Sequence, residues 1–317
     1  MKLTPGLVSI ALTVFSYSFT SAFADDPKPK VIYGKDDRLD LFAVTNSRDL
    51  ALADSTVALI SVNGLKPTAT GFDIAGDPFG AAYSLCQTER FFEQPTGASC
   101  SGSLVGEDLV ITAGHCIPDA ESCETTKFVF GYGVKEDGVF PTSARSDDVV
   151  GCKEIVDRKQ IGDGADYAVI RLDRKIENHR PLSINRGADV KNGDKIGVIG
   201  HPCGLPTKVA FGESEVRDAT PNGFFRANLD TYGGNSGSAV FNTKTGLIEG
   251  ILVRGENDFV EKDGCRVSHL CAPTGCRGED VTKISALAHL IPDNPLPPVP
   301  PRKPPSSRWP LAASLKR

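Results

Sequence analysis

The stretch from Gly233 to Ser238 contains the residues best suited to nucleophilic chemistry. It reads Gly-Gly-Asn-Ser-Gly-Ser and precedes a short apolar run, 239–241. Glycine lets the backbone turn sharply and approach a ligand closely. A nucleophilic serine needs such a turn, because its hydroxyl must be exposed and nearby amides must converge on one point. Clusters of Gly, Ser and Asn also form ordinary turns, so Ser236 is a candidate nucleophile only if it has suitable partners elsewhere.

A serine nucleophile requires a base, and histidine is scarce in this chain. The five candidates are His115, His179, His201, His269 and His289. His115 follows an apolar run and a small-residue turn, in Val-Ile-Thr-Ala-Gly-His-Cys at 110–116, where the cysteine could fix the site. A single histidine usually has a buried structural role, but this context favours His115 as the base.

The base in turn requires a carboxylate that orients it. Asp166 opens the run Asp-Tyr-Ala-Val-Ile-Arg-Leu at 166–172, so it stands at the mouth of a strongly apolar strand. A partly buried acid in that position can hold an imidazole and stay ionised. Asp163 lies close by but in a glycine-rich loop, where it is less constrained, and a turn aspartate is the simpler explanation for either residue.

In chain order the three candidates are His115, Asp166 and Ser236. This pattern resembles the trypsin/chymotrypsin-like serine proteases, and more closely their bacterial glutamyl-endopeptidase (V8-like) branch. The resemblance covers roughly 31–291, and the start Val-Ile at 31–32 also looks like the mature N-terminus of that branch. Three motifs carry it: Thr-Ala-Gly-His-Cys at 112–116, Asp-Tyr-Ala-Val-Ile at 166–170, and Gly-Gly-Asn-Ser-Gly-Ser at 233–238.

The resemblance implies an all-β fold of two six-stranded antiparallel barrels, with the site between them and a C-terminal helix. It implies that Ser236 attacks the scissile carbonyl, that His115 transfers the proton and that Asp166 holds the imidazole. The amides of Gly234 and Ser236 match the oxyanion hole of the family. The implied activity is a secreted serine endopeptidase that works through an acyl-enzyme.

Other implications concern cysteines and activation. Cys100 and Cys116 match the disulfide that clips the loop beside the family's histidine. Trypsin-like enzymes place an aspartate before the nucleophile, where it pairs with the new N-terminal amine; here Asn235 takes that position, as in the V8-like branch. Two alternatives stay open, a catalytically silent homologue that binds proteins and a serine esterase.

The substrate pocket is predicted from the same resemblance. Asp230, six residues before Ser236, falls where trypsin-like enzymes place the acid that selects basic side chains. Thr231 falls where glutamyl endopeptidases place a pocket threonine. Those enzymes also carry a histidine on the later pocket strand, where this chain has Leu252 and Arg254. Arg254 could attract an acidic side chain or neutralise Asp230, and we favour the basic-selective interpretation slightly.

The elements that must position these residues are mostly strands. Short apolar runs separated by Gly, Pro, Asn and Asp fill the chain from 55 to 253, which predicts an all-β barrel or sandwich. We place the N-terminal barrel at about 31–180 and the C-terminal barrel at about 181–280. Apolar residues every third position from Val281 to Leu290, between Asp280 and Pro292, predict a helix over 281–291.

The two ends of the chain have a different character. Residues 1–24 are predicted to be a signal peptide, because an apolar run ends at the small-x-small site Ala-Phe-Ala. Residues 25–30 form a possible propeptide of a zymogen, cleaved before Val31. The tail 292–317 is proline-rich and too polar to fold; it is a flexible spacer or, alternatively, a docking segment for an unknown partner.

Composition limits the remaining possibilities. A net charge of -5 does not indicate a nucleic-acid surface. The nine cysteines suggest disulfides in an exported protein, with at least one cysteine outside them. A bridge among Cys265, Cys271 and Cys276 is plausible, whereas the sequence leaves the partners of Cys86, Cys123, Cys152 and Cys203 open. No metal or organic cofactor is implied, although calcium binding stays open. No membrane contact is expected once the signal is removed. The expected partners are protein or peptide substrates.

Overall fold

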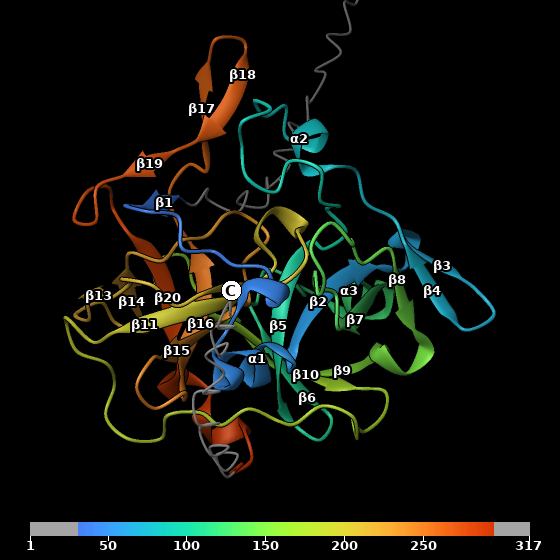
Figure 1. The fold of residues 1–317 in the computed structure, drawn as a ribbon. Helices are drawn as coiled ribbons and strands as arrows, with labels where there is room; N and C mark the ends of the chain where they lie inside the picture. The colour runs from blue at the N-terminus through green and yellow to red at the C-terminus, as the bar shows by residue number, and fades with distance from the viewer. Residues whose placement is uncertain (1–30, 295–317) are drawn as a thin grey trace, which may run out of the picture.

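The computed structural model describes residues 31–294. The predicted signal peptide, the possible propeptide and nearly all of the proline-rich tail therefore lie outside the described residues. The described chain forms two β-rich halves that lie side by side (Figure 1). None of its helices has the length and hydrophobicity that crossing a bilayer requires.

The first half is a closed barrel of six strands. Each strand pairs with its neighbours in antiparallel fashion, in the order β10-β6-β5-β2-β7-β9. The strands are β2 (Thr56–Ser61), β5 (Cys100–Gly106), β6 (Leu109–Thr112), β7 (Thr126–Phe130), β9 (Val149–Gln160) and β10 (Asp166–Leu172). Aliphatic and aromatic side chains such as Leu59, Phe128 and Ile170 fill its interior. β-Branched and aromatic residues are enriched in strands.

The second half is an antiparallel sheet of seven strands in the order β12-β11-β15-β16-β20-β14-β13. Its strands are β11 (Ile196–Gly200), β12 (Lys208–Ala210), β13 (Val216–Asp218), β14 (Phe224–Ala227), β15 (Ala239–Asn242), β16 (Ile248–Arg254) and β20 (Glu279–Lys283). The sheet curls around a core that includes Val198, Phe225 and Val281. The all-β, chymotrypsin-like class predicted from the sequence is thereby confirmed.

The second half differs from the predicted six-stranded barrel in two respects, because it has seven strands and is not a closed barrel. Its edge strands β12 and β13 have three residues each. Strands this short do not pair with each other; instead Lys195, just before β11, bridges to Glu215, just before β13, and backbone bonds join 193–196 to 214–216. The result is a curled sheet in place of a second closed barrel.

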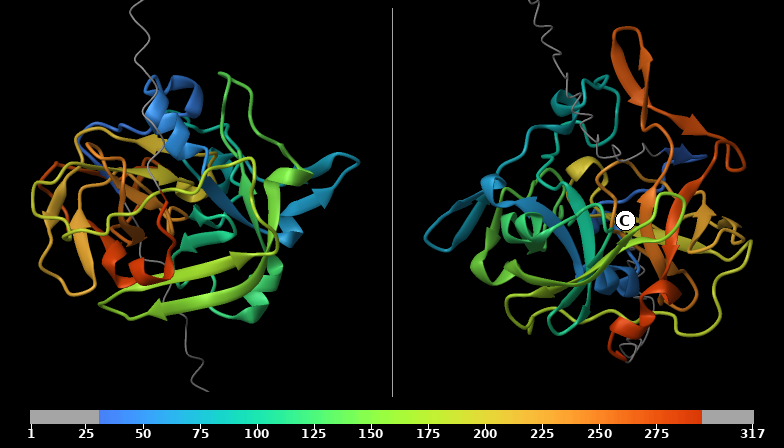
Figure 2. Two further views of the ribbon diagram at one scale, coloured as in Figure 1. Left: turned by 90° about the horizontal axis from the view of Figure 1, so that it is seen from below. Right: turned by 180° about the vertical axis from the view of Figure 1, so that it is seen from behind.

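Smaller elements surround the two halves. The strands are β1 (Ile32–Tyr33), β3 (Leu65–Pro67), β4 (Gly71–Ile74), β8 (Ser143–Arg145), β17 (Phe259–Lys262), β18 (Cys265–Ser268) and β19 (Leu270–Cys271). The α-helices are α1 (Ser47–Ala53), α2 (Phe79–Ala82) and α3 (Ala120–Thr125), with 3₁₀ turns η1 (Leu41–Ala43), η2 (Val62–Gly64), η3 (Ser146–Asp148) and η4 (Pro202–Gly204). Figure 2 shows the β17–β18 hairpin projecting from the body of the molecule.

The helix predicted over 281–291 is wrong. Strand β20 continues to Lys283, and two 3₁₀ turns follow, η5 (Ile284–Ala286) and η6 (Ala288–Leu290). Apolar residues spaced by three fit the three-residue period of a 3₁₀ helix as well as one face of an α-helix. The first of them, Val281, pairs with Leu252 in the sheet, so tertiary pairing overrides the local pattern.

The N-terminal segment 31–40 joins the second half, although the sequence groups it with the first barrel. Ile32 pairs with Leu270 in a parallel ladder, and Leu39 bridges to Val209. A shared core of both halves lies beside this segment and includes Ile111, Tyr167, Ile199 and Phe241. The side chains discussed next stand at the boundary of the halves.

Four disulfides cross-link the described chain. They join Cys86 to Cys265, Cys100 to Cys116, Cys123 to Cys152 and Cys271 to Cys276. The bond between Cys100 and Cys116 is the one that the resemblance implied. Cys203 is the buried cysteine that lies outside these bonds, which accounts for the odd count.

Candidate active site

Ser236 lies in a tight loop that leads into β15. The amide of Asn235 donates to the Tyr232 carbonyl (3.1 Å) and the amide of Ser238 to the Asn235 carbonyl (3.0 Å), so the chain turns twice around the serine. Gly237 adopts φ +88°, and a Cβ there would lie 2.0 Å from the backbone oxygen of Ser101. Only glycine fits this conformation and this close contact, which explains why a glycine follows Ser236.

His115 is held by the turn that follows β6. The Cys116 amide donates to the Ala113 carbonyl (3.1 Å), and the Cys100–Cys116 disulfide fixes the turn to the start of β5. Arg158 Nε donates to the carbonyl oxygen of Gly114 (2.7 Å), which adds a tie to β9. The imidazole is therefore anchored from three strands of the first barrel.

Asp166 orients the imidazole through two hydrogen bonds. His115 Nδ1 lies 2.7 Å from Asp166 Oδ2, and the His115 amide donates to Oδ1 (3.1 Å). The acid side chain is 3% exposed and the histidine 17%, so water competes little for the contact. Asp166, and not Asp163, is thus the carboxylate that the structure places on His115.

Thr282 on β20 holds Asp166 from the other half of the molecule. Its hydroxyl accepts from the Asp166 amide (3.0 Å) and donates to the Asp166 carbonyl (2.9 Å). Sequence reasoning missed Thr282, because it is 116 positions away from Asp166 and carries no local motif. The contact fixes the acid relative to the sheet that bears Ser236.

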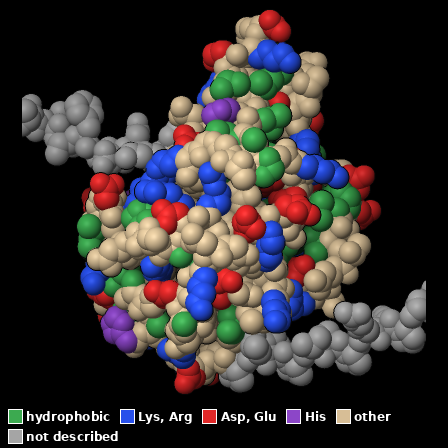
Figure 3. Space-filling model, turned by 90° about the vertical axis from the view of Figure 1, so that its left-hand side faces the viewer, with side chains coloured by type: hydrophobic (Ala, Val, Ile, Leu, Met, Phe, Trp, Pro, Cys, Tyr) green, Lys and Arg blue, Asp and Glu red, His purple; other side chains and the backbone are tan. Residues whose placement is uncertain are grey.

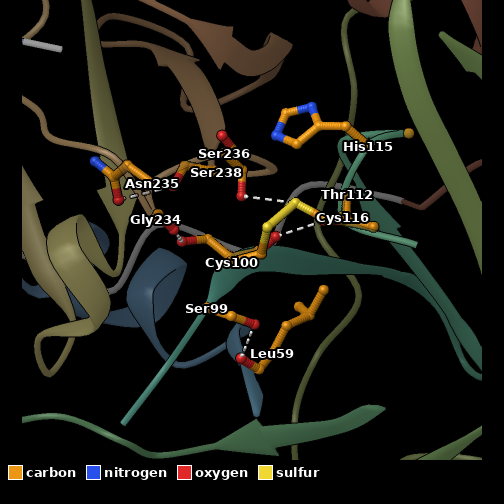
Figure 4. The surroundings of a disulfide bond; sticks show 12 residues. Leu59, Ser99, Cys100, Thr112, His115, Cys116, Gly234, Asn235, Ser236 and Ser238 are labelled. Atoms are coloured by element: carbon orange, nitrogen blue, oxygen red, sulfur yellow. Dashed lines mark hydrogen bonds between the residues drawn. A yellow bond between two sulfur atoms is a disulfide. The ribbon is translucent and has the colours of Figure 1, made fainter. Parts of the chain in front are cut away.

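The second ring nitrogen of His115 is available for chemistry. His115 Nε2 is buried and has no hydrogen-bond partner among the described residues. Figure 4 shows the side chains of His115 and Ser236 next to each other, beside the Cys100–Cys116 disulfide. With Nδ1 bound to a carboxylate, Nε2 of a neutral imidazole is a base that can remove a proton from a nearby hydroxyl.

The backbone before Ser236 has a fixed orientation. The Gly233 carbonyl accepts from the Cys203 amide (2.5 Å), and the Gly234 carbonyl from Ser101 Oγ (3.2 Å). In a planar trans peptide the N–H points opposite to the C=O. The Gly234 N–H therefore points away from the turn that contains Cys203, as a donor to a bound anion must.

Comparison with known proteins agrees with this geometry. Residues 100–251 match the trypsin-like peptidase domain. Glutamyl endopeptidases of Staphylococcus aureus strains MRSA252 and MW2 are each 26% identical over 164 residues, which is 49% of this chain and 43% and 47% of those proteins. These matches support the trypsin/chymotrypsin-like superfamily that the sequence motifs indicated. The aligned part spans less than half the length of these relatives.

Among solved structures, the chain is similar to the Vibrio cholerae VesB protease. The TM-score is 0.46 and the identity 14%, with 82% of this chain and 66% of that chain covered.

The carboxylate of Asp230 is bound inside the protein. The residue is 2% exposed, and its carboxylate accepts from the amides of Tyr33 (2.7 Å) and Asp37 (2.9 Å). Burial raises the pKa of Asp230 to about 8, and the charge of Asp37 adds to the increase. Two backbone amides thus occupy the Asp230 carboxylate, and its role as the acid that selects basic side chains stays a prediction.

Arg254, the other charged pocket candidate, is bound inside the protein. Its Nε donates to Asp280 Oδ2 (3.1 Å) and its Nη2 to the Gly164 carbonyl (2.9 Å). Asp280 is buried and also binds Arg226 and Arg277. Arg254 is therefore a partner of Asp280 and not of Asp230, and its role toward an acidic substrate stays a prediction.

The two uncharged pocket candidates are buried. Thr231 Oγ1 accepts a hydrogen bond from Asn235 Nδ2 within the nucleophile loop. Leu252 packs in the core of the second sheet, and its carbonyl accepts from the Gly237 amide (2.8 Å). Both residues thus support the loop around Ser236, which sequence position alone did not reveal.

Two groups of side chains in residues 31–294 lie close enough to share a metal ion. One consists of His115 with Cys100 and Cys116, the other of His269 with Cys271 and Cys276. In both groups the cysteines are joined in disulfides, and a cysteine binds zinc only as a free thiolate. Neither group fits a metal in the oxidised protein.

Proposed function

We propose that the protein is a serine endopeptidase that hydrolyses peptide bonds through an acyl-enzyme. The observation that carries the proposal is the 2.7 Å contact between His115 Nδ1 and Asp166, with the opposite side of the imidazole beside Ser236. The match of residues 100–251 to the trypsin-like peptidase domain supports a peptidase in general. The whole activity is a proposal, because the relatives align over only part of their length.

Each residue has a role in this proposal. Ser236 Oγ attacks the scissile carbonyl while His115 Nε2 takes its proton; the same proton then goes to the leaving amine, and an acyl-enzyme remains. Water attacks that ester with His115 again as base. Asp166 keeps the proton on Nδ1 and stabilises the imidazolium. The amides of Gly234 and Ser236 bind the oxyanion, where one donor is typically worth about 10²–10³ in rate.

The experiment compares purified wild type with Ser236→Ala. We expect a fluorophosphonate to label wild type at Ser236, and we expect peptide hydrolysis by wild type only. Hydrolysis by Ser236→Ala in a clean preparation would end the proposal. Labelling together with cleavage of esters but no peptides would favour the esterase alternative, and a correctly folded chain without labelling would favour the silent homologue.

Specificity is the second part of the proposal. Asp230 and Arg254 both have partners inside the protein, so we propose that peptides with an uncharged P1 side chain are cleaved at least as well as those with Arg or Lys. The relatives are named glutamyl endopeptidases, so the peptide library must include Glu at P1. Cleavage strictly after Arg or Lys would contradict this part and leave the mechanism intact.

We further propose export and N-terminal processing. Disulfides persist in oxidising compartments, and four of them cross-link the described chain. N-terminal sequencing of exported material should begin at Val31. A start at Asp25 with full activity would remove the propeptide from the proposal.

A further inference from the structure

We propose that Ser101 is a positioning residue that fixes the oxyanion-binding backbone of the nucleophile loop. The inference deepens the proposed function and rests on it. Ser101 follows Cys100 in β5 of the first barrel and is fully buried. No motif in the sequence marks it.

All polar groups of Ser101 are engaged, and two of them hold the loop. Its amide donates to the Ser236 carbonyl (2.8 Å), and its hydroxyl donates to the Gly234 carbonyl (3.2 Å). Its own carbonyl accepts from Thr112 Oγ1 (2.7 Å). Figure 4 shows how closely this part of β5 approaches Gly234 and Ser236.

The direction of the hydroxyl proton follows from a third contact. Ser101 Oγ accepts from the amide of His201 (2.9 Å). One lone pair therefore faces His201, and the proton is directed to the carbonyl oxygen of Gly234. Ser101 thus links the first barrel to the turn at His201–Gly204, which belongs to the second half and also holds the Gly233 carbonyl through the Cys203 amide.

With Ser101 in place, four successive carbonyls are fixed. Ser101 holds two of them, Gly234 O through its hydroxyl and Ser236 O through its amide. The amide of Cys203 holds Gly233 O, and the amide of Ser238 holds Asn235 O. Each N–H is opposite to the carbonyl of its own peptide unit. The Gly234 and Ser236 donors belong to the units held by Cys203 N and Ser238 N. The Ser101 hydroxyl holds the unit between these two, so it restrains the geometry of both donors without touching substrate.

Ser103 provides a matched control on the same strand. It is also fully buried, and its hydroxyl makes no hydrogen bond among the described residues. Ser101→Ala and Ser103→Ala delete the same atom two residues apart, yet only the first removes a contact to the loop. A purely structural role for a buried serine hydroxyl predicts similar behaviour of the two variants.

The experiment measures kcat and KM per active site, counted with a fluorophosphonate, for wild type and both variants. Inhibition by a peptide aldehyde, whose adduct carries an oxyanion, is compared with inhibition by the same peptide as a carboxamide. For Ser101→Ala we expect kcat and aldehyde affinity to fall about tenfold, with KM and carboxamide affinity unchanged. Ser103→Ala should match wild type in all four values.

The inference is overturned if Ser101→Ala equals Ser103→Ala, or if it changes KM and both inhibitors alike. If Ser101→Ala fails to fold, Ser101→Thr keeps the oxygen; it should keep the wild-type ratio of the two inhibition constants, and loss of that ratio overturns the inference. Absence of labelling in wild type would mean that the proposed function fails, and the inference with it. Labelling of wild type at Ser236 with no effect of Ser101→Ala removes the inference alone.

Discussion

The protein contains two histidine–aspartate pairs of similar geometry and different surroundings. His115 Nδ1 lies 2.7 Å from Asp166, and His179 Nδ1 lies 2.9 Å from Asp54. The other nitrogen of His179 faces a second acid, Asp148, at 3.5 Å. The His179 ring also stacks on Phe130 with centroids 4.3 Å apart.

The comparison shows that a histidine–aspartate contact does not by itself make an active site. Nε2 of His115 makes no hydrogen bond among the described residues, and the side chain lies next to Ser236, so this nitrogen is open to a reacting group. The His179 ring lies between two carboxylates. Although burial lowers the pKa of His179, the hydrogen bonds and charges of Asp54 and Asp148 outweigh it and raise the pKa. That environment suits a persistent structural cation.

The largest expected difference comes from removing each ring. His115→Ala should lower kcat by on the order of 10⁴-fold or more and leave thermal unfolding nearly unchanged. His179→Ala should leave kcat within about twofold, and it should cost about 1–2 kcal/mol of unfolding free energy because the stacking on Phe130 is lost. Peptide hydrolysis and denaturant unfolding of both variants test this. Equal loss of activity would break the distinction.

Neutralising each acid is the next test. Asp166→Asn should lower kcat by about 10³–10⁴-fold, because the amide cannot hold the required tautomer. Asp54→Asn changes an exposed partner of the other pair and should leave kcat unchanged. Steady-state kinetics at saturating peptide separates the two, and an activity loss in Asp54→Asn would contradict the structural role of His179.

A smaller effect is expected from Thr282→Val, which removes both hydrogen bonds to the backbone of Asp166. We expect kcat to fall about tenfold with KM unchanged, since loss of about 1.4 kcal/mol of positioning energy is tenfold in rate. Thr56→Val is the control, because Thr56 Oγ1 is buried without a hydrogen-bond partner in the described part of the chain. Equal kcat in both variants would argue against positioning by Thr282.

The smallest effect concerns pH. The pKa of His179 is raised in the folded protein above its ordinary value of 6.5. The stability that protonated His179 contributes is therefore fully present below pH 6.5, and it is lost as the pH rises through the folded-state pKa. His179→Gln should therefore destabilise the fold more at pH 5.5 than at pH 8.5. We expect a difference of about 0.5 kcal/mol after solvent screening, measured by urea unfolding. A larger loss at high pH would contradict the assignment.

Local motifs were sufficient to predict some features and not others. The strand class followed from short apolar runs, the contact of His115 with Asp166 from short motifs, and the Cys100–Cys116 bond from the family resemblance. For Asp230, the sequence could not reveal that the amides of Tyr33 and Asp37, more than 190 positions earlier, donate hydrogen bonds to its carboxylate.

The sequence also could not reveal the partner of a charged side chain or the kind of helix that an apolar repeat forms. Arg254 looked available because its partner Asp280 lies on another strand of the sheet. The apolar period of three after Val281 fits two kinds of helix, and only pairing with β16 decides the conformation. On the face in Figure 3, positive and negative side chains are interspersed, and such pairing depends on contacts that chain order does not specify.

The Cys86–Cys265 disulfide has a consequence for fragments of the chain. It closes a covalent loop that spans 179 residues and joins a segment of the first half to the projecting β17–β18 hairpin. A single backbone cut inside that loop, for example near the exposed Ile161, leaves both pieces attached to one molecule. A molecule nicked there, for example by a second copy with the proposed endopeptidase activity, would keep both pieces covalently joined until the medium became reducing.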